Sequence, residues 1–372
     1  MINLLVIFGG ESCEHEISVI TGVQLMNNCN KYIYNIIPVY INKSGKWVTG
    51  SNLFDIDNYP NYLRDLKECT LVPNSDYLYI KKFNKFKKLC KVDCAIICLH
   101  GMRGEDGVVA GILEMSKIPY ASSSICCSSI CLDKVVFKSL MKGLEISVID
   151  GFGFDKRSFE NNQNDIINKI EDLAFPVIIK PSRQGSSVGI SICKDISDLI
   201  PQLNKAFLYD EKLLIEKFVQ IKKEVNIALF RYKDDIIYST TEEPIKFGDY
   251  LSFDEKYRKS GGDFEKIKRI VPANITQEQL GEIKSIASKV YDNLDAVGVV
   301  RFDFIIDENE MIYLNEVNTI PGSMANYLFK ENFDYEAIIN MLVKNAVFIK
   351  RDSQIKTIDS GVLEEGILGI KK

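Results

Sequence analysis

Residues 299–319 are, in order, VVRFDFII, DENE and MIYLNEVNT. The first and third runs are rich in β-branched and aromatic residues, and the run between them is polar. Two such runs joined by a short polar turn predict a β-hairpin whose side chains alternate between two faces. We expect Ile306 to pair with Met311, a register that sets Arg301 opposite Glu316.

This register gives one face of the hairpin a polar character. Asp303, opposite Leu314, shares that face with Arg301, Glu316 and Asn318. Two carboxylates and a carboxamide are hard oxygen ligands that suit Mg²⁺ and leave positions open for phosphate oxygens, and a guanidinium suits an anionic reacting group. The alternative is a solvated face on which Arg301 pairs with Glu316. The opposite face, expected in the core, carries Phe302, Phe304, Tyr313 and Val317.

The composition is typical of a soluble globular protein with more than one domain. With 372 residues the chain is long for a single core, so two or three domains are expected. The net charge of −5 argues against nucleic acid or an anionic membrane as the main partner. The apolar run Leu4–Phe8 is too short to span a membrane and lacks a cleavage-type signal, so we expect a buried first strand and a cytoplasmic protein.

The ten cysteines and two histidines do not form a metal-binding pattern. Most of the cysteines lie inside apolar runs, as Cys94 and Cys98 do. No C-x-x-C pair is matched by a second pair at the spacing of a zinc site. We therefore expect reduced, buried thiols.

The N-terminal segment has the order strand, glycine-rich turn, helix. Val6–Phe8 runs into Gly9–Gly10 and then into an acidic stretch with Glu14 and Glu16. This order is similar to the opening of a nucleotide-binding α/β unit. Acidic residues near a helix start complement the helix dipole, so Glu16 either has that role or holds a substrate ammonium group.

Residues 51–90 are polar, and we expect them to be irregular. A buried strand at Cys94–Leu99 then leads to a glycine-rich loop that begins at His100. Loops at the carboxyl ends of parallel strands bind ligands in open α/β sheets, so His100 is either a ligand-binding residue or a partner of nearby backbone. A helix at Val108–Met115 and a short strand complete the first domain near residue 121.

The middle of the chain carries a Ser/Gly-rich loop between two β-rich runs. Lys180 and Arg183 flank the start of this loop, which continues to Gly189. Backbone amides and hydroxyls of such a loop wrap phosphate oxygens while a lysine adds charge, although an ordinary hairpin turn can have the same composition. Glu216 closes another buried run and is a candidate partner for a ribose or an adenine edge.

A long irregular segment and two helices complete the pattern. Residues 242–273 lack periodicity, which is typical of a functional loop or lid. An amphipathic helix is expected at Gln277–Asp295, directly before the hairpin. A last helix is expected from Tyr335 to Lys350.

Several of these motifs occur in an order that resembles the ATP-grasp superfamily. Together with Phe8–Gly10 and Leu99–Gly107, they are similar to the D-alanine–D-alanine ligase family over residues 3–350. The motifs that carry the resemblance are Lys134, Lys180 with Gly185–Gly189, Glu216–Val219, Arg301-x-Asp303 and Asn315–Gly322.

The resemblance implies an α/β (α+β) ATP-grasp fold with three domains. Residues 1–121 would form an N-terminal Rossmann-like, pre-ATP-grasp domain, residues 122–213 the central subdomain, and residues 214–372 the C-terminal subdomain with the metal site and a flexible loop at 245–262. The implied reaction joins two D-alanine molecules through a D-alanyl phosphate, releases ADP and phosphate, and supplies a peptidoglycan precursor. The partners would be ATP, D-alanine and a second D-amino acid, in a homodimer with no nucleic-acid or membrane partner.

Roles for individual residues also follow from the resemblance. Asp303, Glu316 and Asn318 would hold two Mg²⁺ (or Mn²⁺) ions that offset the charge repulsion of phosphoryl transfer. Glu16, oriented by Ser186, would hold the ammonium of the first D-alanine.

The same resemblance implies contacts to the reacting groups and to ATP. Arg301 and the Gly322 amide would stabilise an oxyanion. Tyr257 would close a loop over the site and exclude water. ATP would be bound by Lys134, Lys180, Glu216, Lys217, Phe218, Val219 and Glu224. Further substrate contacts would come from His100, Lys256, Tyr327 and Leu328.

The sequence departs from the family pattern where the second substrate would bind. The family usually has a Ser-His-Ser-Leu-type run after Pro-Gly, whereas here Asn326 replaces the histidine and Tyr327 replaces the serine that receives the second carboxylate. The loop around Tyr257 is also longer. Three hypotheses result: a D-alanine–D-alanine ligase, a ligase for D-serine or another small acceptor, and a non-catalytic ATP or amino-acid binding module. The complete set of phosphate and metal candidates argues against the module.

Overall fold

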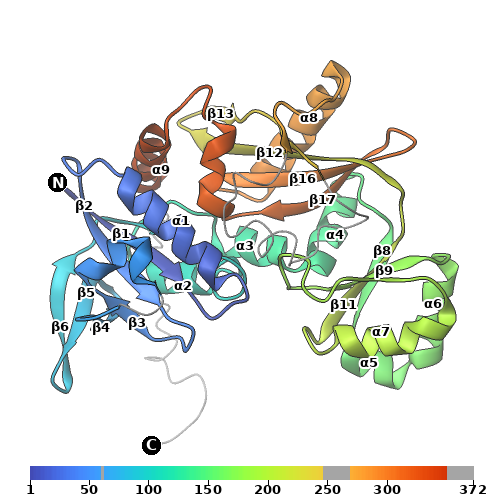
Figure 1. Ribbon diagram of the computed structural model, residues 1–372, viewed down its shortest axis with the longest axis horizontal. Coiled ribbons are helices and arrows are strands. Elements are labelled where there is room, and N and C mark those ends of the chain that lie inside the picture. Colours follow the sequence, from blue (N-terminus) through green and yellow to red (C-terminus); the bar gives the residue numbers. More distant parts are fainter. Residues whose placement is uncertain (60–62, 246–268, 350–372) are drawn as a thin grey trace, which may run out of the picture.

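The computed structural model describes residues 1–59, 63–245 and 269–349. Three large β-sheets follow one another along the chain, and helices pack against each of them (Figure 1). The expected mixed α/β architecture is confirmed. No helix within the described ranges is both long and apolar enough to cross a membrane.

The N-terminal sheet has seven strands in the order β6-β5-β4-β3-β2-β1-β7. Its centre is parallel: β1 (Ile2–Gly9) lies between β2 (Tyr34–Ile41) and β7 (Cys94–Ile97). Residues 4–8 of β1 are completely buried, which confirms the predicted first strand. Because β1 and β7 run in the same direction, the loops that follow them lie at one edge of the sheet, where open α/β sheets bind ligands.

The described residues between 51 and 90 (51–59 and 63–90) are not irregular, so that prediction was wrong. After two short 3₁₀ turns, they form three antiparallel strands that extend the sheet from β3 (Trp47–Thr49). The outermost strand is mostly exposed, and its lysine-rich composition resembles that of a loop because neither face needs apolar side chains. The added elements are η1 (Ser51–Phe54), η2 (Ile56–Asn58), β4 (Lys67–Val72), β5 (Ser75–Lys82) and β6 (Lys85–Lys91).

Two helices cover the N-terminal sheet. α1 (His15–Asn28) follows the Gly9–Gly10 turn, and α2 (Val108–Met115) lies where it was predicted. Gly9 has a φ of 94°, and a Cβ at this position would collide with the Ile41 carbonyl oxygen. Only glycine therefore allows the chain to leave β1 in this direction and start α1 beside the loop at the sheet edge.

The central sheet is antiparallel, with the order β10-β9-β11-β8. One face of this sheet is covered by helices whose apolar side chains form a separate small core with Val177, Ile179, Leu213 and Ile215. The elements are β8 (Gly151–Asp155), α5 (Lys156–Asn161), α6 (Gln163–Asp172), β9 (Val177–Pro181), β10 (Ser191–Cys193), η3 (Ile196–Asp198), α7 (Leu199–Ala206) and β11 (Lys212–Lys217).

The C-terminal sheet is also antiparallel, with the order β13-β12-β16-β17. Its core is shared with helices from two parts of the chain: α8, and the earlier pair α3 and α4. The small sheet β14–β15 lies beside it. The elements are α3 (Ile125–Leu132), α4 (Lys134–Gly143), β12 (Ile221–Tyr232), β13 (Asp235–Tyr238), β14 (Glu243–Pro244), β15 (Arg269–Ile270), α8 (Gln277–Asn293), β16 (Val300–Asp307) and β17 (Ile312–Asn318).

The last described elements return to the N-terminal sheet. After β17 the chain forms η6 (Gly322–Leu328) and α9 (Tyr335–Ile349), close to the predicted helix. Ile338 and Leu342 of α9 belong to the same buried cluster as the strands of the N-terminal sheet. Tyr34 donates a hydrogen bond to Asn340 at 2.7 Å, so polar contacts reinforce this packing. α9 therefore completes the first core rather than the last one.

The predicted domain division remains a prediction, but the sheets suggest other limits. The boundary between residues 213 and 214 falls inside β11, which belongs entirely to the central sheet. α3 and α4 pack on the C-terminal sheet, although the prediction grouped them with the central one. All ten cysteines are free thiols; Cys13 and Cys126 are exposed, contrary to the expectation that the thiols are buried.

The hairpin forms, but its register differs from the expected one. Ile306 pairs with Ile312 rather than with Met311. A β-bulge at Asn315 then shifts the pairing once more, so that Asp303 lies opposite Glu316 and Arg301 lies opposite Asn318. Because two one-residue shifts restore the alternation of faces, the four polar side chains still share one face.

The bulge also corrects the composition of the core face. Tyr313 pairs with Ile305 on the opposite side from the core, so its expected place there was wrong. The buried face instead carries Phe302, Phe304, Ile306, Ile312, Leu314 and Val317.

Candidate active site

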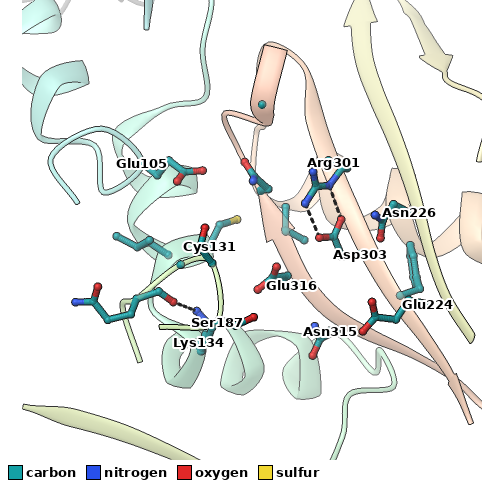
Figure 2. A pocket seen from close by; sticks show the side chains of 18 of the residues that line it. Glu105, Cys131, Lys134, Ser187, Glu224, Asn226, Arg301, Asp303, Asn315 and Glu316 are labelled. Carbon is teal, nitrogen blue, oxygen red and sulfur yellow. Dashed lines mark hydrogen bonds and ion pairs between the residues drawn. The ribbon is translucent and has the colours of Figure 1, made fainter. Parts of the chain in front are cut away.

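The three sheets and η6 surround a cavity of about 300 Å³. This volume is at the lower end of the range for pockets that bind small molecules. Figure 2 shows that side chains from α3 and α4 face those of β12, β16 and β17 across it. Residues distant in sequence, such as Glu14, Lys180 and Glu316, line the same cavity.

The polar face of the hairpin forms one wall of this cavity. Arg301, Asp303, Glu316 and Asn318 all line it. Arg301 donates two hydrogen bonds of 2.7 Å to the two oxygens of Asp303 (Figure 2). The alternative of a solvated face with an Arg301–Glu316 pair is therefore wrong.

The donor set on this wall suits a divalent cation with hard-ligand preference. Asp303 and Glu316 lie directly opposite each other on neighbouring strands, and the Asn318 side-chain oxygen accepts a hydrogen bond from the Ile320 amide at 3.0 Å. Within the described residues no three His, Cys, Asp or Glu side chains gather as a metal cluster. Two carboxylates and a carboxamide fit Mg²⁺, which commonly takes its remaining ligands from water and substrate phosphates.

The pKa of Asp303, on this wall, is subject to opposing effects. Burial raises the pKa of Asp303, the Arg301 guanidinium opposes that effect, and Glu316 adds to it. Two carboxylates opposite each other in a buried place favour the arrival of positive charge.

A second wall contains a buried carboxylate held by two lysines. Glu216 has no exposed surface and forms ion pairs with both Lys138 and Lys180. Burial raises the pKa of Glu216, but the two lysines outweigh it, and the net pKa is lowered. Burial lowers the pKa of Lys138 to about 8. Lys180 also donates to the Asn315 side chain at 3.4 Å, which links this wall to the hairpin.

Lys134 lies at the start of α4 and holds the Ser/Gly-rich loop. Its ammonium group donates to the Gln184 carbonyl oxygen at 2.7 Å, and its amide donates to the Ser182 carbonyl oxygen at 3.0 Å. The loop lies between β9 and β10, as predicted, and Ser186, Ser187 and Gly189 have positive φ angles. Successive residues of this kind turn backbone N–H groups toward a common point, which suits an anion.

Glu16 does not reach the cavity. Its side chain is 66% exposed and forms an ion pair with Lys43. Glu14 lines the cavity instead, and its carboxylate accepts a hydrogen bond from the Ser186 hydroxyl. The placement of Glu16 as the ammonium-binding residue was therefore wrong, while Ser186 does orient a carboxylate, that of Glu14.

His100 and Glu105 line the same end of the cavity as Glu14. His100 lies within 3.0 Å of the Thr21 hydroxyl, and burial lowers its pKa to about 4, so the imidazole is neutral. Glu105 accepts a 2.7 Å hydrogen bond from the Gly101 amide; burial, followed by the charge of Glu14, raises its pKa to about 8. This end of the cavity therefore holds two neighbouring carboxyl groups, and the pKa of one of them, Glu105, is raised.

Other predicted site residues have mixed positions. Glu224, Gly322 and Tyr327 line the cavity; Tyr327 donates to Glu242 at 2.8 Å rather than pointing an unused hydroxyl at solvent. Lys256 and Tyr257 lie outside the described residues. Four other predicted site residues, each next in sequence or close to a lining residue, do not line the cavity themselves. The four are Lys217, Phe218, Val219 and Leu328.

Several lining residues were missed by the sequence analysis. Lys138 follows Lys134 by one helical turn, so the i, i+4 spacing already places it on the same face of α4. Glu105 stands inside the predicted ligand-binding loop after β7. Asn226, Glu242 and Arg269 had no sequence signal, because only the pairing of β12 with its neighbours brings them to the cavity.

Two antiparallel sheets face each other across the cavity; one wall carries lysines and the other carries paired carboxylates. This is the arrangement of an ATP-grasp fold. Family models for the D-ala D-ala ligase N-terminus and C-terminus match residues 3–123 and 140–344. The chain belongs to the D-alanine–D-alanine ligase family, and it is an enzyme of that type. The predicted fold and family are confirmed.

Individual relatives agree over nearly the whole chain. A D-alanine–D-alanine ligase of Thermosipho melanesiensis is 35% identical over 366 residues, which cover 98% of this chain and 99% of the relative. The solved D-alanine–D-alanine ligase of Helicobacter pylori is 28% identical with a TM-score of 0.74, and the match covers 92% of this chain and 98% of that one. The VanG D-Ala:D-Ser ligase of Enterococcus faecalis is 26% identical with a TM-score of 0.79, covering 93% and 99%.

Proposed function

We propose that the protein joins two D-alanine molecules at the expense of ATP and so supplies a peptidoglycan precursor. The carboxylate of the first D-alanine attacks the γ-phosphorus of ATP and ADP leaves. The amine of the second D-alanine then attacks the acyl phosphate, loses a proton and releases phosphate. The observation that carries the proposal is that Lys134 and Lys180 share one cavity with Asp303 and Glu316.

The nucleotide end of the cavity is assigned to the lysine wall. Lys134 and Lys180 are cations suited to phosphate oxygens, and the Ser/Gly-rich loop adds backbone amides. Glu216 is the group for the adenine edge and Glu224 for the ribose. Since Lys180 pairs with Glu216 in the structure, ATP binding would move this lysine from the carboxylate to the phosphates.

Asp303, Glu316 and Asn318 are the residues that would hold Mg²⁺ or Mn²⁺. When bound, these ions offset the negative charge on the phosphates as the carboxylate approaches. Arg301, fixed by its two hydrogen bonds to Asp303, and the Gly322 amide are the groups for the oxyanion that forms when the amine attacks.

The first D-alanine is assigned to the end of the cavity with Glu14. A carboxylate fixed by the Ser186 hydroxyl suits an ammonium group. The exposed Glu16 lies only two positions away in sequence and provides a matched control.

Glu14→Gln is expected to raise the KM for D-alanine by roughly 10- to 100-fold, because a charge-assisted hydrogen bond to the ammonium is weakened. Glu16→Gln is expected to leave it nearly unchanged. Initial rates of phosphate release over a range of D-alanine concentrations measure both variants. A larger rise in the KM for D-alanine in the Glu16→Gln protein than in the Glu14→Gln protein would instead assign the ammonium group to Glu16.

The reaction itself is tested by product identification. ATP, Mg²⁺ and D-alanine should give one ADP, one phosphate and one D-alanyl-D-alanine per turnover, measured by mass spectrometry together with phosphate release. L-alanine should give no dipeptide. Phosphate release that does not depend on D-alanine, or that proceeds without dipeptide, would contradict the proposal.

A second candidate is a ligase that prefers another small acceptor, such as D-serine. It is favoured by Tyr327, which stands where the family pattern has a serine, and by the similarity to a D-Ala:D-Ser ligase. Competition between D-alanine, D-serine, D-lactate and glycine for the acceptor position, resolved by product mass, separates the candidates. A cytoplasmic location and a homodimer remain part of the proposal, and size-exclusion chromatography with light scattering tests the latter.

A further inference from the structure

A row of four polar residues crosses the C-terminal sheet and continues beyond the metal-binding candidates. Glu242 pairs with Asn226 through two backbone hydrogen bonds of 2.9 Å, Asn226 pairs with Asp303, and Asp303 pairs with Glu316. Directly opposed residues in antiparallel strands carry their side chains on the same face. All four line the cavity, and Figure 2 shows Asn226 on the strand beside Asp303.

The row extends along the cavity from Glu316 and Asp303 at one end to Glu242 at the other. Neighbouring strands lie about 4.8 Å apart, so Glu242 is roughly 10 Å from Asp303 along the row. Phosphoryl transfer is assigned to the Asp303–Glu316 end. A small amino acid whose amine approaches from the side of Asn226 has the rest of its molecule over Asn226 and Glu242.

The far end of the row is occupied by a compact charged cluster. Glu242 is buried and accepts hydrogen bonds from Tyr327 at 2.8 Å, from Asn226 at 3.0 Å and from Arg269 at 3.1 Å. The Arg269 guanidinium also lies 4.4 Å from the centre of the Tyr327 ring. A guanidinium stacked on a ring and paired with a buried carboxylate is held in one orientation.

Tyr327 is not suited to receive a substrate carboxylate in this cluster. A phenol has one proton to donate, and here that proton is donated to Glu242. The serine of the family pattern is therefore not simply replaced by a hydroxyl on a longer side chain. Another donor must take over the carboxylate of the second substrate.

Within the part of the chain that the structure describes, the cations of the cavity offer one candidate for that task. Among the described lining residues, the three lysines belong to α4 and the central sheet, at the nucleotide end. Arg301 is engaged by both oxygens of Asp303. Arg269 lies at the far end of the row, lines the cavity and is 18% exposed, and its planar guanidinium matches the geometry of a carboxylate.

We propose that the Arg269 guanidinium receives the carboxylate of the acceptor amino acid. The assignment rests on the proposed ligase function and deepens it: the acceptor is a small amino acid, or another small molecule with a free carboxylate, that lies along the row from Asp303 to Glu242. Glu242 and Tyr327 act as positioning residues that hold Arg269 in place.

D-Alaninamide is the probe that isolates this contact. It has an amine but no carboxylate, so it can accept the acyl group but cannot be activated by ATP. With D-alanine as donor and equal concentrations of D-alanine and D-alaninamide as acceptors, the ratio of D-alanyl-D-alanine to D-alanyl-D-alaninamide measures the preference for a carboxylate. Mass spectrometry reads both products from one reaction.

The wild-type protein should prefer D-alanine by at least about tenfold, the scale of a charge-assisted hydrogen-bonded pair. Arg269→Met should bring the ratio to within roughly threefold of unity and raise the acceptor KM, while the KM for ATP stays nearly unchanged. Arg269→Lys keeps the charge without the two-pronged geometry and should give an intermediate ratio. Tyr327→Phe keeps the ring beneath Arg269 and should retain most of the preference.

Arg231→Met is the matched control, since Arg231 pairs with Asp292 and does not line the cavity. It should leave the ratio at the wild-type value. A wild-type protein that uses D-alaninamide as readily as D-alanine, or an Arg269→Met protein that keeps the wild-type preference, would overturn the assignment. If the wild type forms neither product, the ligase function itself fails, which is a different result from ligation without preference.

Discussion

Replacing Glu316 by Gln is expected to reduce dipeptide formation by roughly 100-fold or more while the protein remains folded, since loss of outer-shell metal partners alone commonly costs 10- to 100-fold. Glu316 lies directly opposite Asp303 on the wall assigned to the divalent cation. Glutamine keeps the size of the side chain but removes its charge. The Mg²⁺ concentration needed for half-maximal rate should rise together with the fall in turnover, and phosphate-release assays at several Mg²⁺ concentrations measure both.

Glu308→Gln is the control for this variant. Glu308 is an exposed residue of the turn of the same hairpin, outside the cavity, so its neutralisation changes the charge of the protein equally. Its activity should match the wild type. Undiminished turnover in the Glu316→Gln protein would remove the hairpin from the mechanism, whatever the fold.

Replacing Glu216 by Gln is expected to lower the free energy of unfolding by about 3–5 kcal/mol, because it leaves Lys138 and Lys180 buried without their shared carboxylate. The two lysine side chains are only 6% and 9% exposed, so water cannot replace the lost partner. Urea unfolding followed by circular dichroism measures the loss. Glu282→Gln, a neutralisation at an exposed position of α8, should change the unfolding free energy little.

The deficit of the Glu216→Gln protein should depend on pH in a defined direction. In the wild type the pKa of Lys138 is lowered to about 8, and without Glu216 it falls further. Between the two values the folded variant binds fewer protons than the folded wild type, so its stability rises relative to wild type as pH increases. The deficit should therefore be larger at about pH 6 than at about pH 8.5. If the difference in unfolding free energy between the two proteins does not depend on pH, the titration of Lys138 is not its cause.

The hairpin shows which part of the site sequence patterns can predict. The shared face of Arg301, Asp303, Glu316 and Asn318 followed from alternation alone. The pairing did not, because the turn is one residue longer than expected and the bulge at Asn315 adds a second shift. A bulge leaves no signal in the alternation when two shifts cancel, and only the residues between the two shifts change sides: Tyr313 leaves the core face, and Ile312 and Leu314 join it.

The N-terminal loop shows a different limit. Glu14 and Glu16 are both acidic and both adjoin the start of α1, and composition does not distinguish them. What separates them is a contact over 172 positions of sequence, from Glu14 to Ser186. Lys138 could have been recognised from its spacing to Lys134, whereas Asn226, Glu242 and Arg269 depend on strand pairing that local patterns do not contain.

The return of α9 to the N-terminal sheet has a consequence for how the chain is made. The first sheet is finished at β7, yet the helix that covers part of its apolar cluster begins only at Tyr335. At a synthesis rate of about 5–20 residues per second, the interval between synthesis of β7 and synthesis of α9 is on the order of ten seconds or more. During translation this apolar surface is exposed, and we expect it to bind chaperones that act on nascent chains.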